Sequence, residues 1–524
     1  MRVVAAVLAA VMTAVPCATQ AQTGALSSAE ARGREIYLKG KSPSGRDITA
    51  LVGQGLVATP ATALPCGGCH GPDGLGRPEG GVVPSNITWG HLTKPYGAVS
   101  RFGEHRPAYT AATLARAIAL GIDAAGKSLD ASMPRYRMSE GDLDDLLAHL
   151  KRLETYLDPG LSDDRIILGT VLPGPGPLHA LGQSMRAVVQ AYLDEINARG
   201  GIYGRKLELD AREGEGTRAV LDEARTLGKR AFALVSIFAS GADDEYVELA
   251  EEESLPTIGP FTLFNQDEGS LRRFTFHLFG GLPVQARVLV EYAARRLRGH
   301  KPSTAVIYPA EPQWAAIART VEKQAAEHGW PNTLPIRSAR GEMSAEELAR
   351  RLKSGGIEAV FFFGSPTELV SLTREAERLA WTPHLFLSGS LAGKEIFELP
   401  AVFQDKIFLA YASIPSDHKP AAVTEFSALR RGQTLTERHL LGEMSAYAAT
   451  KLLAEGLRRA GRGLSREKLI AALEKMHGYE TGLTPKLTYG PNRRIGALGA
   501  HVIAVDLEKH AFRVASEWIE LNSK

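Results

Sequence analysis

The strongest signal in the sequence is the run Cys66-Gly67-Gly68-Cys69-His70. Two thiols at this spacing, with histidine directly after the second, are the attachment signature of c-type haem: the sulfurs bond the porphyrin edge and the imidazole binds the iron. A zinc site would need two more thiol or imidazole ligands, and the chain has just one other cysteine, Cys17. A thioredoxin-like pair should open a helix after a strand, whereas residues 59–62 and 71–74 have the composition of loops. The run therefore predicts one covalent haem c.

The N-terminus has the pattern of a secretory signal. Arg2 precedes a short apolar run, and small residues follow up to Ala21. This order predicts a signal peptide over residues 1–21, cleaved near Ala21, and therefore export to the periplasm. Cys17 would leave with it. No later stretch is long and apolar enough for a membrane helix, so we expect a soluble mature protein.

Composition narrows the classes of partner. The chain has 61 Lys+Arg against 59 Asp+Glu, and this balance argues against a nucleic-acid binder, which needs a clear basic excess.

The length of the chain, 524 residues, exceeds that of one ordinary domain. Residues 158–164 are polar and contain a Pro-Gly pair, which predicts a linker after a first domain over residues 22–157.

Two predicted helices flank the haem run. Ser27 and Glu30 have capping-box spacing, and Gly33 follows in mid-helix, where glycine is costly unless another helix crosses closely. A second helix is predicted after Ser139, with leucines along one face. Residues 27–156 thereby resemble a class I cytochrome c, in which the first and last helices cross. The resemblance implies a small all-α domain.

The resemblance also implies a sixth ligand for the haem iron. Met133, followed by proline, lies shortly before the last helix, at the family's ligand position, and His/Met ligation raises the reduction potential. Met138 is less favoured because it directly precedes the capping serine. His91 and His105 are bis-histidine alternatives. Residues 41–65 make a longer lead-in to the haem run than the family usually has, either a loop over the haem edge or a surface insertion.

From residue 165 onward, apolar runs alternate with helical periodicity. The run 165–172 is typical of a strand buried on both faces. Further strands are predicted near residues 206–210, 231–235, 304–308, 359–363, 384–387 and 406–410, with helices that include 313–328, 345–354 and 367–381. This alternation implies parallel sheets covered by helices, and its length implies two lobes.

This part resembles the type I periplasmic solute-binding proteins of the branched-chain amino-acid kind. The matching stretches are residues 181–183, 194–207, 481–484 and 489–494. The resemblance implies an α/β fold of two lobes that close on a solute. The expected lobes are residues 165–284 with 411–495, and residues 285–410 with 496–524.

In that family, loops at the carboxyl ends of the strands bind the solute. Ser240 and Thr262 fall where the amino-acid binders have hydroxyl groups, although an ordinary loop role is an equal alternative. Phe238 and its aromatic neighbours crowd the same loops, which favours a more apolar or aromatic solute, or a cleft without one. Adjacent Asp243 and Asp244 are expected to diverge on a solvated face. The candidate cleft residues are Ser240, Phe261, Thr262, His277, Gln285, Ser365 and Ser388.

These observations predict a periplasmic c-type cytochrome that transfers electrons through a His70/Met133-ligated haem. The fused α/β domain would bind a small molecule or dock a partner. We find no catalytic set and expect an electron carrier rather than an enzyme; oxidation of a bound solute at the haem edge is the least favoured alternative. The haem half resembles cytochromes that accompany quinoprotein dehydrogenases, so such an enzyme or another cytochrome is the candidate redox partner. The alternative is a solute receptor for an ABC permease, with the haem as redox sensor or accessory.

Overall fold

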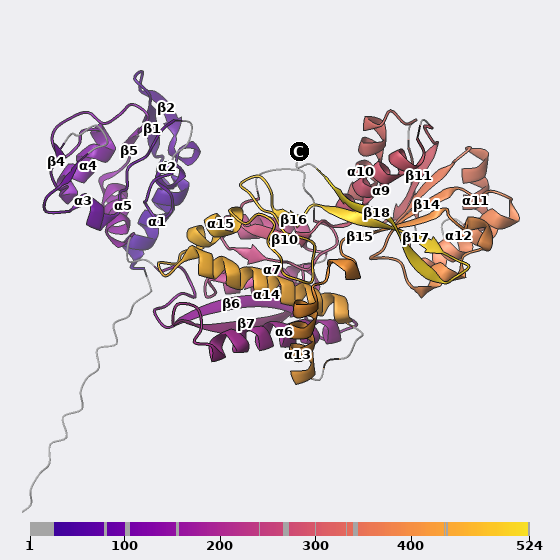
Figure 1. Cartoon of the computed structure of the whole chain (residues 1–524). Helices are drawn as coiled ribbons and strands as arrows, with labels where there is room; N and C mark the ends of the chain where they lie inside the picture. Colours follow the sequence, from indigo (N-terminus) through magenta and orange to yellow (C-terminus); the bar gives the residue numbers. More distant parts are fainter. Residues whose placement is uncertain are drawn as a thin grey trace, which may run out of the picture. The chain divides into compact units, whose positions relative to one another are not determined.

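The computed structural model describes residues 26–521 except 78–80, 100–104, 154–156, 240, 266–271, 299, 332, 339–343, 434 and 436–438. The predicted signal peptide lies outside these residues. The chain divides into two compact units, Met1–Leu157 and Asp158–Lys524 (Figure 1). Among the described helices, none is long and apolar enough to cross a membrane.

Helices surround the core of the first unit, and their ends follow the predicted signals. The first helix begins after Ser27 with a complete capping box to Glu30, and the last begins after Ser139, whose hydroxyl accepts from the backbone N–H of Asp142. Both predicted starts are confirmed. The helices are α1 (Ser28–Lys39), α2 (Cys66–His70), α3 (Trp89–Leu92), α4 (Ala111–Leu120) and α5 (Glu140–Arg152).

Helices α1 and α5 cross at Gly33. A Cβ atom there would lie 1.9 Å from the Asp145 carbonyl oxygen, a separation that forces displacement of the backbone. Beside the crossing, Arg32 forms a two-point ion pair with Asp145, with N···O distances of 2.6 and 2.7 Å. The close approach that the mid-helix glycine predicts is confirmed.

The first unit carries short strands in addition to its helices. Within residues 41–65, β1 (Thr49–Val52) and β2 (Val57–Pro60) form an antiparallel hairpin, and β5 (Arg135–Arg137) pairs with β1. The short strands β3 (Ala98–Val99) and β4 (His105–Arg106) form a second pair. The lead-in to the haem run is therefore structured, and the 3-10 turn η1 (Ala61–Ala63) follows β2. The loop predicted at residues 59–62 is wrong, because these residues end β2 and begin η1. The loop predicted at residues 71–74 is confirmed.

The first lobe of the second unit is a six-stranded parallel sheet in the order β16-β10-β9-β8-β6-β7. Its strands are β6 (Arg165–Pro173), β7 (Lys206–Gly214), β8 (Ala233–Val235), β9 (Thr257–Ile258), β10 (Thr275–Phe279) and β16 (Ile495–Ala497). Helices α6 and α14 pack against each other, and α7 packs with α8. The helices are α6 (His179–Ala198), α7 (Gly216–Gly228), α8 (Asp243–Glu252), α13 (Pro420–Gly432), α14 (Leu440–Ala460) and α15 (Arg466–Glu474).

The second lobe is a seven-stranded sheet in the order β12-β11-β13-β14-β15-β17-β18, parallel as far as β15 and antiparallel beyond it. Its strands are β11 (Thr304–Pro309), β12 (Leu334–Ser338), β13 (Ala359–Phe362), β14 (His384–Ser388), β15 (Ile407–Tyr411), β17 (Gly499–Asp506) and β18 (Ala511–Glu520). Its helices are α9 (Leu282–Arg296), α10 (Ala315–Glu327), α11 (Ala345–Ser354) and α12 (Pro366–Arg378), with 3-10 turns η2 (Pro312–Trp314), η3 (Lys394–Glu398), η4 (Ala401–Phe403) and η5 (Pro415–Asp417).

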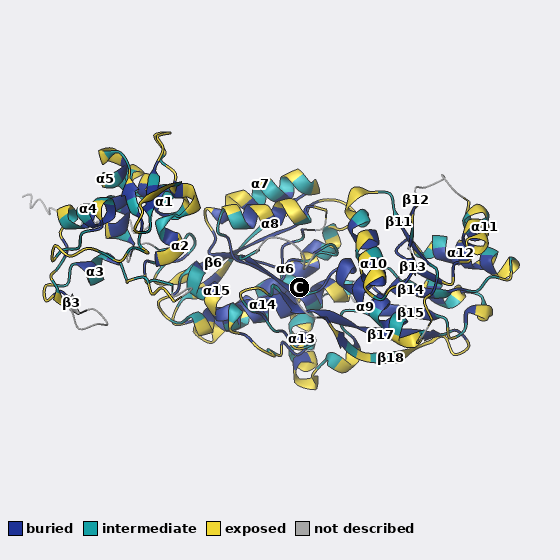
Figure 2. Cartoon of the chain, turned by 90° about the horizontal axis from the view of Figure 1, so that it is seen from above, coloured by how far each residue is buried: buried dark blue, intermediate teal, exposed yellow. Residues whose placement is uncertain are grey.

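The central strands β13, β14 and β15 of the second sheet are buried on both faces. Along β14, Phe386 packs into the layer that contains α9 and α10, whereas Leu385 and Leu387 pack toward α11 and α12. Figure 2 shows the central strands of this unit as buried and the outer faces of α7, α8, α11 and α12 as exposed. The near-continuous apolar runs of the sequence are explained by this double-sided burial.

The chain passes between the lobes three times, from β10 to α9, from β15 to α13 and from β16 to β17. The segment expected as a linker is hydrogen-bonded to the first lobe. The Asp158 carboxylate accepts from the backbone N–H of Arg466 at 2.6 Å, and the Gly160 carbonyl accepts from Ile167 at 2.7 Å. Residues 158–164 therefore fold as part of the second unit.

Candidate functional site

His70 ends helix α2 in a geometry suited to binding iron. Its side chain is buried, and Nδ1 lies 2.9 Å from the Ser85 carbonyl oxygen. Because a carbonyl accepts, Nδ1 carries the hydrogen and Nε2 is left with its lone pair for a metal. Burial lowers the pKa of His70, which keeps the imidazole in the neutral form that ligates metals. Sequence reasoning missed Ser85, because its contribution is a backbone carbonyl that every residue type has.

Cys66 and Cys69 are free thiols three residues apart on α2, so they share one helix face. Cys69 is exposed, while Cys66 packs against the core of the first unit. Burial raises the pKa of the Cys66 thiol to about 12, so it stays protonated at neutral pH. The two sulfurs and the His70 imidazole thus all come from the short helix α2.

Helix α2 packs closely against α1. A Cβ atom at Gly67 would lie 3.1 Å from the Leu38 side chain and 3.4 Å from Tyr37, and the Tyr37 hydroxyl donates to the Gly71 carbonyl at 2.6 Å. A side chain at Gly67 would therefore need the Leu38 side chain to shift by a few tenths of an ångström. This contact fixes the direction in which the haem run presents its ligands.

The candidates for the sixth ligand differ in their surroundings. Met133 is half-buried in the turn before β5, whereas Met138 packs against the core of the first unit. His105 is exposed, with Nε2 3.0 Å from the Tyr96 carbonyl oxygen, and His91 is half-buried on α3. Two thiols, a neutral imidazole with Nε2 available and a thioether fit a haem c.

On the first lobe, Asp243 is a site residue that sequence reasoning missed. The expected solvated face is wrong: Asp243 opens α8, is partly buried, and accepts from the Thr262 hydroxyl and from the Gly241 N–H at 3.0 Å. Burial raises the pKa of its carboxyl group to about 6. Asp244 does face solvent, 3.0 Å from Arg272. The available signal was the position of Asp243 at a helix start, where acceptors are favoured.

His277 lies in the middle of β10 with 6% of its surface exposed, and its Nδ1 has no hydrogen-bond partner among the residues that the structure describes. Burial lowers its pKa to about 3. It shares a cavity of about 10 Å³, near the size of one water molecule, with Asp243 and Thr262. Phe261 stacks on Phe238, with ring centroids 5.8 Å apart. Predicted Ser240 lies outside the described residues.

On the second lobe, the predicted polar residues are bonded within the protein. The Ser388 hydroxyl donates to the Gln285 side-chain oxygen at 2.6 Å, and both residues are buried. The Ser365 hydroxyl donates to Glu368 at 2.8 Å and caps α12. These hydroxyls are therefore committed to positioning loops at the carboxyl ends of β13 and β14.

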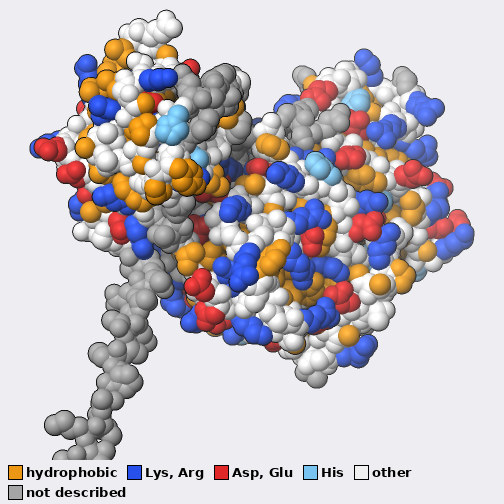
Figure 3. All heavy atoms as spheres, turned by 60° about the vertical axis from the view of Figure 1, so that its left-hand side comes forward, with side chains coloured by type: hydrophobic (Ala, Val, Ile, Leu, Met, Phe, Trp, Pro, Cys, Tyr) orange, Lys and Arg blue, Asp and Glu red, His pale blue; other side chains and the backbone are white. Residues whose placement is uncertain are grey.

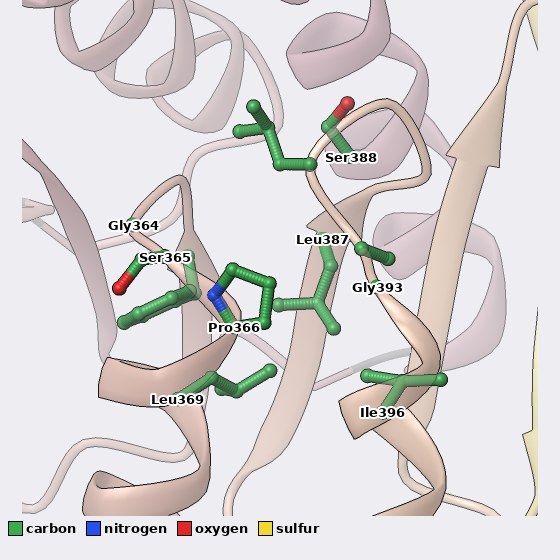
Figure 4. A pocket seen from close by; sticks show the side chains of 11 residues that line it. Gly364, Ser365, Pro366, Leu369, Leu387, Ser388, Gly393 and Ile396 are labelled. Atoms are coloured by element: carbon green, nitrogen blue, oxygen red, sulfur yellow. The ribbon is translucent and has the colours of Figure 1, made fainter. Parts of the chain in front are cut away.

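Ser365 and Ser388 also border one small apolar pocket of about 20 Å³. Figure 4 shows the side chains of Pro366, Leu369 and Leu387 converging there, while both hydroxyls point away. The structure thus brings together Ser365 and Ser388 in the second lobe, and Thr262 and His277 in the first. Each pocket lies within a single lobe.

Comparison with known proteins agrees with this architecture. Residues 165–504 match the family described as periplasmic binding protein, and residues 53–154 match cytochrome c. The Leu/Ile/Val-binding protein BraC3 of Rhizobium johnstonii is 23% identical over 329 residues, covering 62% of this chain and 87% of its own. The leucine-, isoleucine-, valine-, threonine- and alanine-binding protein of Pseudomonas aeruginosa is 23% identical over 330 residues, covering 61% and 85%.

Solved structures show the same fold. A branched-chain amino-acid ABC transporter protein of Thermus thermophilus with bound valine has a TM-score of 0.56 at 17% identity, covering 69% of this chain and 98% of its own. A fatty-acid ABC transporter substrate-binding protein of Thermomonospora curvata has a TM-score of 0.55 at 18% identity, covering 70% and 95%. The chain belongs to the periplasmic binding protein family, and a cytochrome c domain precedes its two-lobed fold.

Proposed function

We propose that the first unit carries one covalent haem c in the periplasm and transfers electrons. The observation that carries this proposal is the His70 Nδ1–H bond to the Ser85 carbonyl, which leaves Nε2 available beside two thiols on the same helix. Bound haem would supply a one-electron couple. Met133 is the proposed sixth ligand, and its neutral thioether favours the reduced iron.

The test is production of the mature chain in a periplasm that contains haem-attachment enzymes. Mass spectrometry under denaturing conditions should show one added haem, and a redox titration should show one single-electron wave. The Cys66→Ala and Cys69→Ala variants should each lose a thioether, while Cys17, predicted to leave with the signal, should be absent from the mature mass. A mature chain without bound haem would refute the proposal.

We further propose that the second unit binds a small solute that is more apolar or aromatic than a free amino acid. Three candidate hydroxyls, those of Thr262, Ser365 and Ser388, already donate to protein acceptors. The stacked Phe238 and Phe261 lie on the loops that follow β8 and β9. Because the named relatives bind leucine, isoleucine and valine, these amino acids are the competing ligands.

Native mass spectrometry of the gently purified protein would identify a retained solute directly. In parallel, thermal-shift measurements would compare leucine, isoleucine and valine with aromatic and aliphatic carboxylic acids. We expect the aromatic or aliphatic acids to raise the melting temperature, and Phe261→Ala to reduce that shift more than Ser365→Ala. Stabilisation by leucine, isoleucine or valine alone would overturn the proposed solute class.

The second candidate function is delivery of a solute to an ABC permease, with the haem as sensor or accessory. The similarity to amino-acid-binding proteins favours it. The Cys66→Ala/Cys69→Ala variant, which cannot attach haem, separates the two functions. Uptake that continues in this variant would support the receptor function, whereas loss of electron transfer from a quinoprotein dehydrogenase, or with another cytochrome, would support the carrier.

A further inference from the structure

Arg135 binds the turn that carries Met133. Its guanidinium donates to the Leu129 carbonyl at 2.8 Å, to the Asp130 carbonyl at 3.2 Å and to the Met133 carbonyl. All three acceptors belong to one short turn between α4 and β5. A guanidinium has five N–H groups in a rigid fork, so a single side chain can satisfy several carbonyls at once.

Hydrogen bonds to Asp130 also order this turn from within. The Met133 N–H donates to Asp130 at 3.2 Å, and the Ser132 N–H donates to the Asp130 carboxylate at 2.9 Å. The Arg135 side chain also lies directly against Gly121, where a Cβ atom would be 1.7 Å from Nε. The guanidinium therefore fills the space between the turn and the end of α4.

The backbone of Arg135 is held from the opposite side. It lies in β5, opposite Leu51 of β1. The next residue, Tyr136, is buried and donates its hydroxyl to the Leu64 carbonyl at 2.7 Å, two residues before Cys66. The hairpin β1–β2 thus connects the Met133 segment with the haem run.

We propose that Arg135 is a positioning residue that holds Met133 at the haem iron, braced by the β1–β2 hairpin. This inference rests on the proposed ligation by Met133. Methionine has three rotatable side-chain bonds, and a neutral thioether is a weak ligand. It competes with outside ligands only if its backbone is already ordered, because ordering during binding lowers the affinity. The three carbonyl contacts of Arg135 supply that order.

Binding of imidazole to the ferric protein measures how firmly the thioether is held, because imidazole must displace it. We expect Arg135→Gln and Arg135→Lys to bind imidazole about tenfold more tightly than the wild type, because both variants lose hydrogen bonds that order the Met133 backbone. The near-infrared band of thioether-ligated ferric haem should weaken in parallel. Arg137→Gln is the matched control, because Arg137 is exposed on the same strand.

Met133→Ala distinguishes the two levels of the proposal. If this variant keeps the near-infrared band, Met133 is not the ligand, and the ligation proposal fails. If it loses the band while both Arg135 variants keep wild-type imidazole affinity, the positioning role alone is overturned. If the Arg135 variants retain no covalent haem, Tyr136→Phe tests the inference instead. This variant removes the hydroxyl that donates to the Leu64 carbonyl, and it should still raise the affinity for imidazole. An unchanged affinity would refute the inference.

Discussion

His149 is buried on α5 with 2% of its surface exposed, and neither ring nitrogen has a hydrogen-bond partner in the described part of the chain. Its ring lies 5.3 Å from that of Tyr37, whose hydroxyl supports the haem run. Burial lowers the pKa of His149 to about 4. The imidazole therefore acts as an apolar packing residue as long as it stays neutral.

The consequence is an acid-sensitive first unit. Since the folded-state pKa of His149 lies below the unfolded value of about 6.5, protonation favours the unfolded chain, and stability falls as the pH drops from about 6.5 to 4. The loss attributable to His149 is at most about 3 kcal/mol. We expect His149→Phe to lose less stability between pH 7 and 4.5, measured by urea unfolding at the haem absorbance. His105→Phe, at an exposed histidine, should behave as the wild type; equal acid losses in all three proteins would contradict the assignment.

Asp243 predicts the opposite trend in the second unit. Its folded-state pKa of about 6 exceeds the unfolded value of about 3.9, so stability falls as the pH rises from about 4 to 6. The free energy of unfolding of Asp243→Asn, compared with that of the wild type, should therefore increase by about 1–2 kcal/mol as the pH rises from 4.5 to 7. Tryptophan fluorescence reports this unit, since four of the five tryptophans follow residue 157. Asp244→Asn, at an exposed carboxylate, is the control. A stability gain in Asp243→Asn that does not change with pH would contradict the raised pKa of Asp243.

At the scale of elements, the close crossing of α1 and α5 contributes to the stability of the first unit. Glycine-to-alanine substitution in a helix ordinarily stabilises by about 1 kcal/mol. At Gly33 the sign should reverse, because the new Cβ would lie 1.9 Å from the Asp145 carbonyl oxygen, and overpacking costs about 1–3 kcal/mol or more. We expect Gly33→Ala to lower the melting temperature of the haem unit.

Gly141→Ala provides the matched control in the partner helix. Gly141 lies in the first turn of α5, and nothing is within 4 Å of a Cβ placed there. This substitution should be neutral or slightly stabilising, measured by the same thermal unfolding curve. Equal effects at the two glycines would show that the crossing is not a tight contact.

At the scale of the whole molecule, the division between Leu157 and Asp158 predicts two independently folding pieces. On the visible face of the second unit, Figure 3 shows Lys and Arg interspersed with Asp and Glu, so neither charge dominates this face. The segment 158–164 belongs to this unit through Asp158, through Gly160, and through the Ser162 carbonyl, which accepts from Arg205 at 2.8 Å.

A truncation series tests the boundary. A chain that starts at residue 158 should unfold at the same temperature as the second unit of the full protein. A chain that starts at residue 165 loses the Asp158 bond to α15 and buried Leu161, so it should be less stable by about 1–3 kcal/mol. Calorimetry of both pieces makes the comparison; identical melting temperatures would mean that residues 158–164 are a linker after all.

The amino-acid sequence alone determined the haem run, the caps at Ser27 and Ser139, and the alternation of strands and helices after residue 165. Each of these depends on neighbours within one turn or one strand, so residue types and their spacing are sufficient evidence. Tertiary structure decided the carbonyl that orients His70, the turn that Arg135 holds, and the burial of Asp243. These depend on segments brought together from distant parts of the chain, and often on backbone groups, which carry no signature of residue type.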